Sequence, residues 1–155
     1  MFGSLKNFIT SRAGGPGPQK FDDKDRRLAT AALLTRVATV DGEMSEVRRE
    51  KLQAVLKSCF DLDDLTTAQL IRDAAAADRS AVDLYHFTRR LNDVLDNKGR
   101  QQIVRMMWQV IYVDKRASEF ESNIIWRTAD LLGVSSRQRI ELRRRVAADA
   151  APNPA

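Results

Sequence analysis

The chain has 155 residues, a length that fits one domain with its own buried core. Hydrophobic residues make up 43% and charged residues 30%, as in soluble globular proteins, and no apolar run approaches the roughly 20 residues of a membrane-spanning helix. One cysteine and one histidine exclude an internal disulfide framework and make a zinc site of these ligands implausible. The net charge of +5 makes acidic proteins, nucleic acids and anionic membranes the partners to consider.

Residues 1–20 look separate from the domain that follows. Apolar residues between Phe2 and Ile9 recur at near-helical spacing, and the glycines and prolines of 13–18 then forbid continued helix. We interpret this segment as an amphipathic arm on a flexible link that touches a membrane surface or a partner, or else as a frayed terminus. The expected domain spans 21–150, with fraying from Ala147 and a tail at 151–155. No secretory signal is evident, so we expect a cytoplasmic protein, peripheral to the inner membrane if the arm binds lipid.

From Phe21 onward, apolar residues recur with the period of a helix, and residues that start or stop helices separate the segments. No stretch alternates with period two for long enough to indicate a strand. The sequence therefore predicts an all-α, single-domain bundle of about seven helices. Their expected bounds are Phe21 to Val40, Ser45 to Cys59, Thr66 to Ala77, Ser80 to Leu95, Ile103 to Asp114, Ser118 to Leu132, and Ser135 or Ser136 onward.

Two of the polar corners between these helices are similar in sequence. The stretch 110–121 matches 37–48 at an offset of 73 residues, which pairs Asp114 with Asp41 and Ser118 with Ser45. Apolar positions of the following helices match as well, and the offset becomes 72 near residue 132. We interpret the chain as two repeated helix–corner–helix units. Such units usually pack about a pseudo-twofold axis, which would bring the two corners close together.

These residues resemble the tellurite-resistance TerB family, a domain also found in co-chaperones of the DjlA type. The resemblance rests on Val-Asp-Gly-Glu-Met-Ser at 40–45 and Val-Asp-Lys-Arg-Ala-Ser-Glu-Phe-Glu at 113–121, and it covers about 21–150. It implies an all-α bundle of two inverted-repeat-like halves, an acidic surface proposed to bind divalent metal, and membrane-associated partners in a stress-response system. This chain departs from the family pattern at Arg48, where the pattern has Glu, and at Lys115, where it has Gly.

The acidic corners are the candidate metal site. Ca²⁺ and Mg²⁺ prefer oxygen ligands, and carboxylates from two facing corners could supply several. The candidate ligands are Asp41, Asp114, Glu121, Glu43 and Glu46. The alternative is structural, because Ser118 and Glu121 have the spacing of a capping box and the aspartates could bind amides at the neighbouring helix starts.

The densest basic group lies near the C-terminus. Arg143, Arg144 and Arg145, with Arg137 and Arg139, form a candidate partner-binding face, although an arginine-rich helix end also suits the helix dipole. Nucleic acid is the less favoured partner, because no aromatic residue follows Trp126 to stack on bases. His86 is expected to be partly buried and hydrogen-bonded rather than catalytic.

These observations favour a non-enzymatic module of a bacterial tellurite-resistance or stress-response system. It would bind a divalent metal or a protein partner through its acidic corners. The alternative is a basic adaptor that docks on an acidic protein, nucleic acid or membrane through its last helix. We expect no enzyme, because no nucleophile, base or cofactor motif suggests a reaction.

Overall fold

A computed structural model describes residues 23–42, 44–80 and 84–150. These ranges form a helical bundle without strands, as the sequence predicted, and none of their helices is long and apolar enough to cross a membrane. The helices are α2 (Asp23–Thr39), α3 (Glu46–Phe60), α4 (Asp64–Ser80), α5 (Tyr85–Val94), α6 (Asn97–Tyr112), α7 (Glu119–Leu131) and α8 (Ser136–Ala150).

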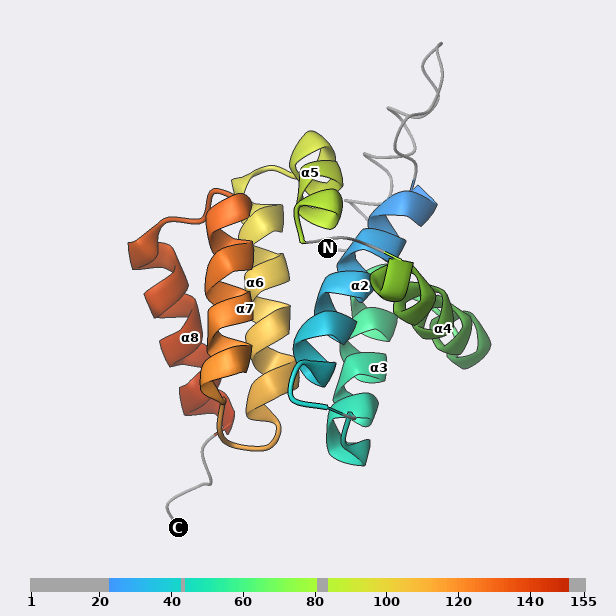
Figure 1. Cartoon of the computed structure of the whole chain (residues 1–155), viewed down its shortest axis with the longest axis horizontal. Helices are drawn as coiled ribbons and strands as arrows, with labels where there is room; N and C mark the ends of the chain where they lie inside the picture. Colours follow the sequence, from blue (N-terminus) through green and yellow to red (C-terminus); the bar gives the residue numbers. More distant parts are fainter. Residues whose placement is uncertain (1–22, 43, 81–83, 151–155) are drawn as a thin grey trace.

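Helix α2 lies at the centre of the bundle and packs against α3, α4, α5, α6 and α7 (Figure 1). It is buried on all sides over residues 29–35, whereas the sequence indicated one apolar face. Leu33 and Leu34 both have no exposed surface, and the small side chains of Ala31 and Ala32 let neighbouring helices approach closely. A helix that is apolar or small all round is a core helix rather than a surface helix.

The two repeated corners lie at the same end of the bundle, at the lower edge of the view in Figure 1. One joins α2 to α3, and the other joins α6 to α7. Helix α8 packs along α6, and α4 packs on α2 at the opposite side of the molecule (Figure 1).

Two helix starts differ from the sequence prediction because other side chains act as caps. Helix α4 begins at Asp64 rather than Thr66, since Asp63 accepts a hydrogen bond from the Thr66 amide at 2.7 Å. Asp96 caps α6 by accepting from the amide of Gly99 at 2.9 Å. Gly99 therefore lies in the first turn of α6 and does not break the chain between helices.

Two helix ends also differ from the prediction. Ser80 ends α4 instead of starting the next helix, and its hydroxyl donates to the carbonyl of Ala76 at 3.1 Å. Helix α8 continues to Ala150, beyond the expected fraying at Ala147. Its start is capped by Ser135, which accepts from the amide of Gln138 at 3.2 Å.

Candidate functional site

The two corners each contain a residue with positive φ and a matching turn hydrogen bond. Gly42 and Lys115, which are 73 positions apart, both have positive φ, at 131° and 67°. The amide of Gly42 donates to Thr39 O at 3.0 Å, and the amide of Lys115 donates to Tyr112 O at 2.7 Å. Lys115 therefore adopts a left-handed conformation that glycine accepts at lower cost.

Matching serines start the helices that follow the corners. Ser45 accepts from the amide of Arg48 at 3.2 Å, and Ser118 accepts from the amide of Glu121 at 3.1 Å. Only the second is a full capping box, because Glu121 Oε1 also accepts from the Ser118 amide at 2.8 Å. In the first corner the equivalent side chain is Arg48, so its charge is free to act elsewhere.

Arg48 joins the two corners. Its guanidinium donates from one terminal nitrogen to Glu121 Oε2, and its Nε lies 2.8 Å from Asp114 Oδ2. The Arg48 side chain is 11% exposed and that of Glu121 is 2% exposed. Arg48 thus lies between two carboxylates of the opposite corner and is largely shielded from water. One of them belongs to Glu121, the residue at the equivalent position 73 residues further along the chain.

The electrostatics of Glu121 follow from this contact. Burial acts to raise the pKa of the Glu121 carboxyl. Hydrogen bonds from Arg48 and the Ser118 amide, with the charge of Arg48, oppose that effect, and the pKa of Glu121 lies below its ordinary value. A smaller influence of Asp41 acts in the same direction, so the first corner's aspartate also lies near this carboxyl.

The structure places two of the five candidate metal ligands, Asp114 and Glu121, on Arg48, and Asp41 of the first corner acts on Glu121. Among the described residues no group of three or more acidic, histidine or cysteine side chains is arranged to hold a metal ion. Glu46 is exposed in the first turn of α3, and Glu43 lies outside the described residues. The guanidinium of Arg48 occupies the position between Asp114 and Glu121 that a cation bridging the corners would take. In this arrangement the cluster does not fit a divalent ion, because its two strongest ligands are already paired.

Sequence reasoning noted Arg48 as a departure from the family pattern but missed its role. The offset of 73 residues could have predicted this role, because it places the basic Arg48 at the position equivalent to the acidic Glu121. If two similar units pack about a pseudo-twofold axis, as the sequence predicts, residues near that axis meet their own equivalents. Opposite charges at equivalent positions therefore predict a pair between the units.

Exposed apolar residues stand next to both members of this pair in the sequence. Val47 is 48% exposed and Phe120 is 67% exposed, although the sequence placed Val47 on a buried face. The two residues occupy equivalent positions in the first turns of α3 and α7, beside Arg48 and Glu121. Val40, at the end of the first unit's leading helix, is 37% exposed. We call the surface formed by Val40, Val47 and Phe120 the corner surface.

The arginines of the candidate basic face on α8 differ in their contacts: some pack against neighbouring helices, and the others are exposed to solvent. Arg139 is 5% exposed, lies 4.3 Å over the Trp126 ring, and donates to Trp126 O, Asp130 Oδ1 and Val134 O. Arg143 lies over the Trp108 ring at 4.7 Å, and its Nε donates to the Tyr112 hydroxyl. Arg139 is thus part of the scaffold rather than of a binding face.

The remaining members of that face are exposed. Arg145 pairs with Glu141 at 3.1 Å one turn away, and Arg144 is exposed on α8.

The single histidine and the single cysteine of the chain lie outside both corners. His86 is exposed on α5, with its ring edge against Phe87, so the expectation of a partly buried histidine was wrong. Cys59 is buried, as expected from its apolar face, and burial raises the pKa of its thiol to about 11. At neutral pH that thiol is protonated and therefore a poor nucleophile.

Comparison with known proteins agrees with the resemblance seen in the sequence. The family model described as tellurite resistance protein TerB matches residues 27–144, which include both corners. Searches of curated proteins and of solved structures found no match.

Proposed function

Because the chain belongs to the TerB tellurite-resistance family, we propose that it is a non-enzymatic module of a bacterial tellurite-resistance or stress-response system. In this proposal the module is cytoplasmic and binds a protein partner through the corner surface. The observation that carries the proposal is the exposed pair Val47 and Phe120, at equivalent positions beside the ion pair of Arg48 and Glu121.

The corner surface has the composition of an interaction site. Phe120 presents a large apolar side chain to solvent, and aromatic residues are enriched at the energetic centres of protein interfaces. In the same turns of α3 and α7, Arg48 pairs with both Asp114 and Glu121, so a partner docking here need not leave either carboxylate without a cationic partner. Both features favour an apolar contact over the binding of a free ion.

Two site properties support a role without catalysis. The carboxyl of Glu121 is held in its charged form by Arg48, which suits an ion pair better than proton transfer near neutral pH. The Cys59 thiol is buried and has a raised pKa, which suits a core residue better than a nucleophile.

The proposal is tested by charge placed on the corner surface. We expect Phe120→Glu and Val47→Glu each to reduce tellurite tolerance in the native host, and Val47→Glu to abolish photo-crosslinking of the partner from a photoreactive residue at position 120. The matched control is Leu65→Glu, because Leu65 is 84% exposed at the start of α4, away from the corners. Equal tolerance in Phe120→Glu and wild type, at equal protein levels, would contradict the proposal.

The metal alternative makes a separate prediction. If Asp41 and Asp114 bind Ca²⁺ or Mg²⁺, millimolar ion should raise the melting temperature, and the double variant Asp41→Asn, Asp114→Asn should abolish the rise. Because Arg48 occupies the cluster, we expect no rise in the wild type beyond that produced by a monovalent salt of equal ionic strength. A specific rise that disappears in the double variant would restore the metal hypothesis.

The basic-adaptor alternative depends on the exposed part of α8. It expects salt-sensitive binding to anionic liposomes or nucleic acid that is lost when Arg143, Arg144 and Arg145 are neutralised. The packing of Arg143 on Trp108 makes it the least available of the three.

A further inference from the structure

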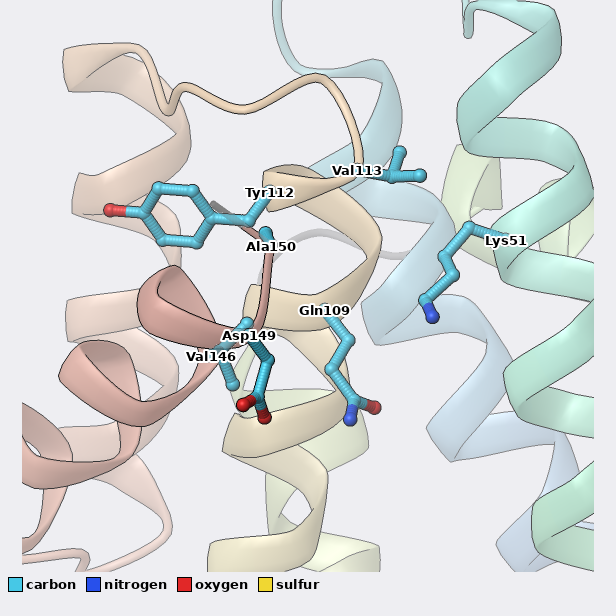
Figure 2. A pocket seen from close by; sticks show the side chains of 7 residues that line it. All are labelled: Lys51, Gln109, Tyr112, Val113, Val146, Asp149 and Ala150. Carbon is cyan, nitrogen blue, oxygen red and sulfur yellow. The ribbon is translucent and has the colours of Figure 1, made fainter. Parts of the chain in front are cut away.

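A groove between α3 and α6 has features that the corner surface does not explain. A cavity of about 340 Å³ lies between these helices, and a second cavity of about 220 Å³ adjoins it toward α8. Both are lined by Lys51 of α3 and Gln109 of α6, so they form one continuous depression. Figure 2 shows Lys51 reaching from α3 toward α6, with the amide of Gln109 on the same side.

The two walls of the groove carry like charges. Lys51 lines it from α3 and Arg105 lines it from α6. Across residues 23–42, 44–80 and 84–150, neither side chain has an ion pair or hydrogen bond, whereas Arg36, Arg48 and Arg139 are all paired with carboxylates. The larger cavity has no acidic residue in its lining, and Asp149 of α8 borders only the smaller one. An anionic ligand would therefore find two unpaired cations on facing walls.

The floor and the polar groups of the groove fit a peptide. Val55 and Met106 provide apolar surface at the base, where an aliphatic side chain could be buried. The side-chain amides of Gln102 and Gln109 stand seven positions apart on one face of α6 and can hydrogen-bond to a main chain. The larger cavity has no aromatic side chain in its lining and the smaller one has Tyr112 alone, so the groove lacks the series of aromatic side chains on which single-stranded nucleic acid stacks successive bases.

We propose that the groove between α3 and α6 binds an acidic peptide segment of another protein. Carboxylates of the peptide pair with Lys51 and Arg105, and an apolar residue between them packs on Val55 and Met106. This binding mode lays the peptide along the helices, as in other helix-lined grooves. The proposal does not depend on the corner surface, which lies on the ends of the helices rather than along them.

The probe is a phage-displayed library of random peptides, selected on the full-length protein. We expect enriched sequences to carry Asp or Glu on both sides of an apolar residue. Their affinity, measured by fluorescence polarisation of the synthetic peptides, should fall about tenfold or more in Lys51→Glu, Arg105→Glu, because two ion pairs are lost and reversed. Circular dichroism verifies that this variant is folded.

The control variant is Lys98→Glu, Arg89→Glu, which changes the net charge equally at exposed positions outside the groove. The control variant should still bind the peptides. Val55→Ser should weaken peptide binding although it does not change the charge of the groove. Enriched peptides without acidic residues, no enrichment over the Lys51→Glu, Arg105→Glu variant, or an equal loss in the control would each overturn the proposal. Tighter binding of a labelled oligothymidine through Lys51 and Arg105 would replace the peptide with nucleic acid.

Discussion

Arg48 shows how one side chain changes the chemistry of a site built from two similar halves. A buried carboxylate without a partner is costly, and Glu121 is nearly inaccessible to water. Arg48 offsets that cost with a charge that also contacts Asp114. The sequence predicted, from the offset that pairs Asp41 with Asp114, that the two corners would come close together. It did not predict their pairing, because a pair across the chain depends on how the two units pack.

Replacing Arg48 should change how stability depends on pH. In the wild type the folded pKa of Glu121 lies below its ordinary value of 4.5, so the pair's contribution is present above that value and is lost as pH falls through the folded pKa. In Arg48→Met, only the Ser118 amide and Asp41 still oppose the effect of burial, so the pKa of Glu121 should rise and the variant should lose stability relative to the wild type as pH rises. We expect a loss of about 3 kcal/mol near neutral pH that shrinks toward about pH 4.

Urea unfolding at several pH values measures this difference. The control is the double variant Arg48→Met, Glu121→Gln, which removes the titrating carboxyl. The difference in the free energy of unfolding between Arg48→Met and this double variant should therefore follow the titration of Glu121. A deficit in Arg48→Met that stays constant from about pH 4 to about pH 7 would show that Glu121 is not the group responsible.

At the scale of elements, the sequence predicted which segments are helical better than where they begin. Thr66 has the spacing of a capping box, but Asp63 lies close enough to cap the helix first. Ser80 has the composition of an N-cap, but its hydroxyl bonds back into the helix that it ends. Both residue types can serve either role, and local spacing does not decide between them. The corner at Ser118 was predicted correctly, because its cap and its Glu121 partner are adjacent in sequence.

The backbone conformation of Lys115 in the second corner should lower the stability of the protein. Its φ of 67° is unfavourable for a residue with a Cβ, and glycine occupies the equivalent position in the first corner. Lys115→Gly should raise the free energy of unfolding by about 1 kcal/mol. Lys115→Ala, which keeps the Cβ, should leave it nearly unchanged, and Gly42→Ala should lower it. Thermal denaturation checks all three; a loss of stability in Lys115→Gly would indicate that the lysine side chain outweighs the backbone strain.

Arg139 carries the attachment of α8 to α7. Its guanidinium donates to Trp126 O, Asp130 Oδ1 and Val134 O, a geometry that a lysine ammonium cannot reproduce from one position. Arg139→Lys should therefore lower the free energy of unfolding by about 2 kcal/mol. Arg144→Lys on the same helix is the control, and chemical denaturation should show no measurable change there. Equal stability of the two variants would show that Arg139 is not an anchor.

At the scale of the whole molecule, α2 links the two units. It contacts α3 and α4 on one side and α5, α6 and α7 on the other, so neither unit buries its apolar surface alone. The sequence indicated only one apolar face for this helix, because its alanines and threonines have no strong periodic signal. The small volume of these side chains indicates a central helix only once the positions of the neighbouring helices are known.

The central position of α2 predicts a single unfolding transition. Leu33 is fully buried, and Leu33→Ala should lower the free energy of unfolding by about 3 kcal/mol. Trp108 and Trp126 both belong to the second unit, so tryptophan fluorescence and far-UV circular dichroism should shift to the same lower urea midpoint. A fluorescence midpoint that remains at the wild-type value while the dichroism midpoint falls would show that the units unfold independently.

The guanidinium between the corners also decides how the protein responds to its surroundings. An ion taken from solution leaves its site when its concentration falls, so the shape of an ion-bridged corner follows the supply of that ion. Arg48 is covalently attached, and its local concentration beside Glu121 stays high at any ionic composition. In the proposed function, the corner surface therefore keeps one geometry whatever the level of a metal ion, and partner binding through it should not depend on the supply of that ion.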